Sequence, residues 1–135
     1  MKEKRDHLFT SRAIECISSQ LEEEEHVVAV VSQARRRPYV GAVSAAAGAV
    51  ATYDVSFVAT DRRLFTIKLS FLVGRPVRVT RIVPLGAGCE ANWHPEDKVW
   101  QELDMTLEGK EHAYRVHRNR EYQLPPFVAA VSGRP

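Results

Sequence analysis

An alternating pattern at positions 57–71 places the strongest constraint on what this chain can fold into. Phe57 and Ala59 share one side of a segment that leads into Thr60-Asp61-Arg62-Arg63-Leu64. Beyond it, apolar and polar side chains alternate: Phe65, Ile67, Leu69 and Phe71 against Thr66, Lys68 and Ser70. A period of two is typical of a strand with one buried face. The sequence therefore predicts two strands joined by a tight turn.

The turn itself contains one acidic and two basic residues. An Asp side chain can accept hydrogen bonds from backbone N–H groups two residues further on, so Asp61 is expected to set the turn. We expect Arg62 and Arg63 to support it, through Asp61 or through carbonyl oxygens. These three residues are therefore predicted to be structural.

The rest of the chain predicts a mainly β protein between two helices. An apolar stripe at Ala13, Ile14 and Ile17 predicts a helix from about residue 9 or 10 to residue 20 or 21. It should stop before the glutamates at 22–25, which are unfavourable at the carbonyl end of a helix. Pro125 opens a short closing helix at 125–131. Strands are expected at 26–34, 53–60, 64–72, 77–85, 89–93, 100–107 and 110–118. Residues 39–52 have no clean period, so this segment could form a long loop, a small-residue helix or the start of a strand.

Composition narrows the class of protein. With 135 residues, 44% of them hydrophobic and 27% charged, the chain suits one folded domain. A formal net charge of +2 gives no argument for nucleic acid, and Trp93, Trp100, Tyr114 and Tyr122 do not interleave with basic residues as a single-strand binder requires. The acidic run at 22–25 and the basic run at 35–37 are expected to be solvated surface. Two cysteines without a paired spacing and no signal-like apolar segment favour a cytoplasmic location.

Motifs for catalysis and cofactor binding are missing from the sequence. Gly86-Ala87-Gly88 is half of a nucleotide loop, but no helical pattern follows it. Four potential metal ligands do not assemble into a zinc site, because His112 and His117 fall on opposite faces of one strand: Cys89, His94, His112 and His117. Cys89 and His94 lie near a loop and could converge there. We therefore expect no enzyme activity, no metal and no cofactor.

Three segments carry a resemblance to a known family. Residues 21–31 end a helix and continue as Glu-His-Val-Val-Ala-Val-Val, residues 57–69 surround the turn, and residues 110–133 form a last strand and a closing helix. Together they resemble the bacterial pleckstrin-homology-like (PH-like) domains, which include GRAM-like and YokE-like modules. The family often has Gly-Glu before the valine-rich strand, where this chain has glutamates instead.

The resemblance implies a strongly bent, seven-stranded antiparallel barrel or pair of packed sheets at 22–135, preceded by a helical segment at 1–21. The closing helix would cover one open end, with Phe127 and Val131 as its plug. The core would be lined by Phe57, Phe65, Ile67, Leu69, Leu103, Met105 and Leu107.

Two functions follow as expectations. The first is a non-catalytic interaction module that binds a protein partner or a second copy of itself. The alternative is a peripheral binder of anionic lipid headgroups at the inner face of a membrane, through Arg35, Arg36, Arg37 and Tyr39.

Overall fold

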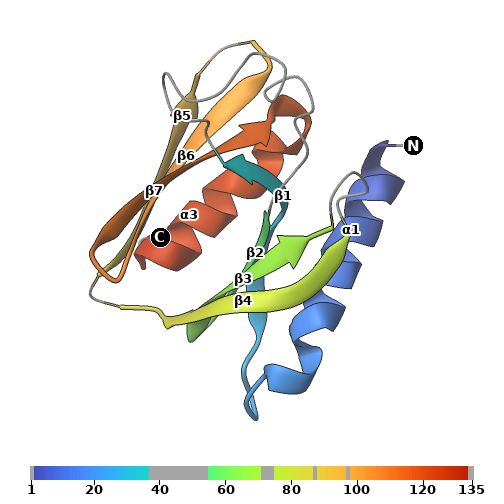
Figure 1. The fold of residues 1–135 in the computed structure, drawn as a ribbon, viewed down its shortest axis with the longest axis vertical. Coiled ribbons are helices and arrows are strands. Elements are labelled where there is room, and N and C mark those ends of the chain that lie inside the picture. The colour runs from blue at the N-terminus through green and yellow to red at the C-terminus, as the bar shows by residue number, and fades with distance from the viewer. Residues whose placement is uncertain (1, 37–54, 71–74, 87, 97, 134–135) are drawn as a thin grey trace.

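The computed structural model describes residues 2–36, 55–70, 75–86, 88–96 and 98–133, as a mainly β fold with a helix at each end (Figure 1). The elements in chain order are α1 (Lys2–Ile17), η1 (Ser18–Gln20), β1 (Val27–Arg36), β2 (Val55–Thr60), β3 (Arg63–Leu69), β4 (Pro76–Pro84), β5 (Cys89–Pro95), β6 (Trp100–Leu107), β7 (Lys110–His117), η2 (Arg118–Gln123) and α3 (Leu124–Ser132).

All seven strands are antiparallel to their neighbours in one sheet of order β4-β3-β2-β1-β7-β6-β5. The central strand β1 pairs with β2 from Val27 to Ala34, but with β7 only at Arg35 and Arg36. This seam, short within the described residues, divides the sheet into two halves that lie at an angle to each other, β2–β4 and β5–β7 (Figure 1). The predicted seven-stranded antiparallel fold with flanking helices is confirmed.

The main hydrophobic core lies where the two halves and α3 meet. Phe57 of β2 packs edge-on against Tyr114 of β7, with ring centroids 4.9 Å apart, and against Phe127 of α3 at 5.8 Å. Phe127 and Val131 are buried in this core, as expected, together with Leu103, Met105 and Leu107 of β6. Burying such side chains contributes roughly 1.5–3 kcal/mol each, so α3 joins the halves mainly through apolar contact.

A second core lies on the opposite face of the β2–β3 hairpin, beneath α1. It consists of Ala13, Ile17, Val58, Phe65 and Ile67. The prediction that Phe65 and Ile67 line the same core as Phe57 is therefore wrong. The register pairs Val58 with Phe65 and Phe57 with Thr66, so the two phenylalanines point to opposite faces. Because α1 covers the outer face, β3 is buried on both sides.

Some predicted boundaries are also corrected. Helix α1 begins at Lys2 rather than at residue 9 or 10, because Lys, Glu and Arg favour a helix even where no apolar stripe is present. It gives way to η1 and ends before the glutamates, as predicted. Strand β1 extends to Arg36, two residues beyond the predicted end. The interpretations of 39–52 fall outside the described residues.

The closing helix agrees well with its prediction. It spans Leu124–Ser132, with proline in its first turn, and Gly133 ends it in the left-handed conformation at φ 66°. In the described part of the chain, the helices are too short or too polar to pass through a bilayer.

Candidate functional site

The β2–β3 turn is held by Thr60 rather than by Asp61. Thr60 Oγ1 accepts hydrogen bonds from the backbone N–H groups of Arg62 at 3.1 Å and Arg63 at 2.9 Å. The Asp61 carboxylate instead accepts from the backbone N–H of His26, at 3.0 Å. The predicted role of Asp61 is therefore corrected: it fastens the turn to the start of β1, and the threonine hydroxyl organises the turn itself.

Next to the turn, Arg63 forms a buried ion pair with Glu25. The guanidinium makes two hydrogen bonds to the Glu25 carboxylate, and its Nη2 also donates to the Gln20 carbonyl at 2.7 Å. Thr60 Oγ1 donates to Glu25 Oε2 at 2.6 Å. The Glu25 side chain is fully buried, so the expectation that residues 22–25 are all solvated is wrong for this residue. Its pKa falls from 4.5 to about 2, chiefly because Arg63 and then Thr60 hydrogen-bond the charged carboxylate.

The proposed headgroup-binding residues are only partly described. Arg35 lies in β1 with its guanidinium 5.3 Å from the centre of the Trp100 ring, a cation–π contact. Arg36 is the last residue of β1, and Arg37 and Tyr39 lie outside the described residues. The structure thus places Arg35 against Trp100 of β6. Whether the four predicted headgroup-binding residues lie together stays a prediction.

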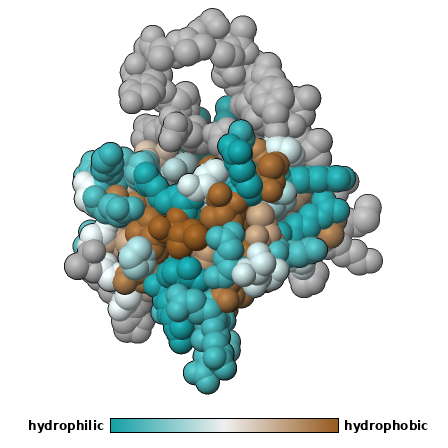
Figure 2. Space-filling view, turned by 60° about the horizontal axis from the view of Figure 1, so that its bottom comes forward, coloured by the Kyte–Doolittle hydropathy of each residue, from teal (hydrophilic) through white to brown (hydrophobic). Residues whose placement is uncertain are grey.

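Apolar side chains reach the surface in several places. Figure 2 shows a band of them, bordered by hydrophilic residues, across the face that it presents. Among the residues that the structure describes, six large apolar side chains are notably exposed: Leu8, Val28, Val77, Ile82, Val99 and Tyr122. Two of these, Val28 and Tyr122, line the same groove.

That groove, which we call the β1 groove, has a volume of about 580 Å³ and a mainly apolar lining. Its lining residues come from α1, β1, η2 and α3: Thr10, Val27, Val28, Ala29, Val30, Tyr122, Gln123 and Pro126. At the inner end of the groove, Gln123 Oε1 accepts hydrogen bonds from the backbone N–H of Ser32 at 3.0 Å and from its hydroxyl at 3.2 Å. The Gln123 side chain thus satisfies the Ser32 backbone N–H of β1, which is bonded to no neighbouring strand in the described part of the chain.

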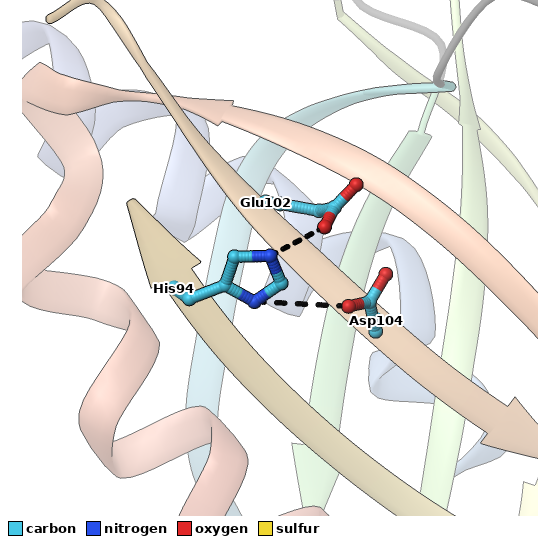
Figure 3. A group of neighbouring side chains, drawn as sticks. All are labelled: His94, Glu102 and Asp104. Atoms are coloured by element: carbon cyan, nitrogen blue, oxygen red, sulfur yellow. Dashed lines mark ion pairs between the residues drawn. The ribbon is translucent and has the colours of Figure 1, made fainter. Parts of the chain in front are cut away.

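On the polar face of β5 and β6, three potential metal ligands meet (Figure 3). His94 lies directly opposite Glu102 in the antiparallel register, and Asp104 is two residues further along β6. His94 Nε2 is 2.6 Å from Glu102 Oε2, and His94 Nδ1 is 3.8 Å from Asp104 Oδ2. The Glu102 side chain is only 8% exposed, whereas those of His94 and Asp104 are about half exposed.

Sequence reasoning missed this cluster because it searched among cysteines and histidines. Cys89 and His94 do not converge: Cys89 belongs to the main core, and His94 lies on the outer face of the same strand. His112 lies near Arg81 and Tyr114, and His117 contacts Trp100. The signal in the sequence was that Glu102 and Asp104 share the polar face of β6. Their partner His94 can be identified only once the β5–β6 register is known.

Comparison with known proteins adds no relative. No family model, curated protein or solved structure matches this chain. Function is therefore argued from the groove and the side-chain clusters described above.

Proposed function

We propose that this chain is a non-catalytic interaction domain that binds an extended segment of a protein partner in the β1 groove. The main support for this proposal is that the groove runs along an edge of β1, and that in the described ranges no strand pairs with this edge. Among the described residues, β7 pairs with β1 only at Arg35 and Arg36, so from Val27 to Val30 the second edge of β1 faces the groove.

The chemistry of such an edge favours an extended peptide. Backbone N–H and C=O groups at an open strand edge are ready to pair with another strand, and added strands gain affinity from main-chain hydrogen bonds and specificity from alternate side chains. Gln123 already satisfies one N–H of this edge, at Ser32. The apolar lining from Val28, Val30 and Tyr122 would receive every second side chain of the incoming peptide.

The arrangement of the strands supports a further part of the proposal, that the domain is PH-like. The seven antiparallel strands, the bend between the two halves of their sheet and the closing helix α3 agree with what the family resemblance implies. PH-like domains serve widely as interaction modules, which is in keeping with an apolar groove along β1.

The groove is tested with Val28→Glu. Val28 is 53% exposed and lines the groove, so a carboxylate there should leave the fold intact and block an apolar peptide. Peptides selected from a random display library on the wild-type chain should bind the variant at least tenfold more weakly, a loss of about 1.4 kcal/mol. Isothermal titration calorimetry with the selected peptides measures the change.

The matched control is Val77→Glu, a substitution of an equally exposed valine on β4, away from the groove. It should bind the selected peptides as the wild type does. Equal loss in both variants, or amide shifts on peptide binding that avoid Val27–Val31, would overturn the proposal. A different result would assign the groove to a second copy of this chain instead. In that case no peptide would be enriched, and light scattering would show a dimer mass that Val28→Glu abolishes.

A second proposal is a peripheral contact of Arg35, Arg36 and Arg37 with anionic lipid. The observation that favours it is the placement of Arg35 and Arg36 at the end of β1. Basic residues near an anionic surface contribute about 1 kcal/mol each, although Arg35 is already stacked on Trp100. Flotation with phosphatidylserine-containing and neutral vesicles should show binding to the former only, and the triple Arg→Ala variant should lose it. Unchanged flotation of the triple variant would rule out this proposal.

A further inference from the structure

We propose that His94, Glu102 and Asp104 form a binding site for one divalent transition-metal ion, of which zinc is the reference case. The three residues come from two adjacent strands, and one ligand atom from each lies within 4.8 Å of the others. This site lies on the polar face of β5 and β6 and is independent of the β1 groove and of the function proposed for it.

The distances suit a metal with short bonds to nitrogen and oxygen. Zinc binds histidine nitrogen and carboxylate oxygen at 2.0–2.2 Å, so that tetrahedral ligand atoms lie about 3.4 Å apart. The two observed separations, 2.6 Å to Glu102 and 3.8 Å to Asp104, bracket this value. They involve different ring nitrogens, so metal binding requires the imidazole to turn until one nitrogen faces both carboxylates. Because the His94 side chain is 54% exposed, it has room to turn.

The backbone holds the ligands in place before any ion arrives. His94 and Glu102 are directly paired across the β5–β6 ladder, and Asp104 is paired with Asn92, two residues before His94. Side chains at such positions share one face of the sheet and lie within reach of one another. The neighbouring cation, Arg115, makes two hydrogen bonds to Glu96, at 3.0 and 2.8 Å, so its guanidinium is held on that carboxylate.

The ligand types also narrow the ion. One imidazole with two carboxylates is a mixed nitrogen and oxygen set, which suits zinc, manganese, iron or cobalt better than calcium or magnesium, whose sites are built from oxygen. The Glu102 carboxylate lies beside His94 and is nearly buried, so a cation bound there would compensate its negative charge where water is largely excluded. Three protein ligands leave at least one position of the ion for water or for a group from a partner.

The test is titration of the metal-stripped, full-length chain with zinc chloride by calorimetry, and with cobalt(II) by visible absorption. We expect one ion to bind per chain, and the visible absorption of bound cobalt(II) to be that of an ion with a low coordination number. Asp104→Asn keeps the shape of the side chain and removes its charge, and His94→Gln removes the nitrogen ligand. Each should weaken zinc binding by at least about tenfold, since each removes one of three ligands.

Two controls address the other donors in the chain. His112→Gln removes a histidine of the same half-sheet that lies beside Arg81 and Tyr114, and should leave binding unchanged. Cys16→Ser removes the partly exposed thiol and should also have no effect. No binding of either metal, or binding that persists in both Asp104→Asn and His94→Gln, would overturn the proposal. The exposure of both side chains makes folded variants the expected case, and circular dichroism checks it.

Discussion

Arg63→Met is expected to destabilise the protein by about 3–5 kcal/mol, because it leaves the Glu25 carboxylate buried without its cation. Arg63 makes two hydrogen bonds to that carboxylate and one to the Gln20 carbonyl, so the substitution also removes three of the hydrogen bonds that link the segment after α1 to the β2–β3 turn. Urea unfolding monitored by tryptophan fluorescence measures the change in the free energy of unfolding.

The adjacent arginine provides the control. Arg62 is 42% exposed and only 3.6 Å from the exposed Glu22, so Arg62→Met should change stability by less than about 1 kcal/mol. The double variant Glu25→Gln/Arg63→Met removes both charges and should recover part of the loss. Equal effects of Arg62→Met and Arg63→Met would show that burial of the pair does not matter.

The same ion pair sets a pH dependence with a definite sign. The pKa of Glu25 is lowered from 4.5 to about 2, so the folded state favours the charged carboxylate. Its contribution to stability is complete above about pH 4.5 and is lost as the pH falls toward 2. The difference in stability between wild type and Arg63→Met should therefore shrink over that range. A constant difference down to pH 2.5 would contradict the assignment.

Phe127→Ala is expected to cost about 3–5 kcal/mol, as large truncations in a packed core do. Phe127 is fully buried and contacts Phe57, which in turn packs against Tyr114. The cavity would open where α3, β2 and β7 meet, so Phe57 would lose its aromatic contact with α3. Thermal and urea unfolding should both report the loss.

An exposed valine supplies the comparison for this truncation. Val99→Ala, at a side chain that is 45% exposed, should alter stability by less than about 1 kcal/mol. If Phe127→Ala proved as mild as Val99→Ala, α3 would not be an integral part of the core. Phe127→Leu keeps most of the volume and should fall between the two.

Local pattern predicted the strands well and the faces of the sheet less well. Strand β6 has the predicted bounds because its period of two runs unbroken over Trp100–Leu107. The period of β3 was also read correctly, but a period indicates only which side chains share a face. It cannot show that α1 covers the face that carries Phe65, because that contact joins distant parts of the chain.

The side-chain clusters escaped the sequence for the same physical reason. Glu25 looked like one of four solvated glutamates, and only the approach of Arg63 makes its burial favourable. His94 and Glu102 meet because the β5–β6 register sets them opposite each other. Residue types were visible in the sequence, but the pairing between strands that gives them chemistry was not.

The short seam between β1 and β7 has a consequence for how the molecule folds. Most strand pairs join neighbours along the chain: β1 with β2, β2 with β3, β3 with β4, β5 with β6 and β6 with β7. The β1–β7 seam and the hydrogen bonds between Ser32 and Gln123 instead join distant positions, and Ser32 and Gln123 are 91 residues apart. Because closing a long loop costs entropy before its contacts form, we expect the two hairpin sets to form early and the junction at β1 to form last, which makes that junction the step that limits the folding rate.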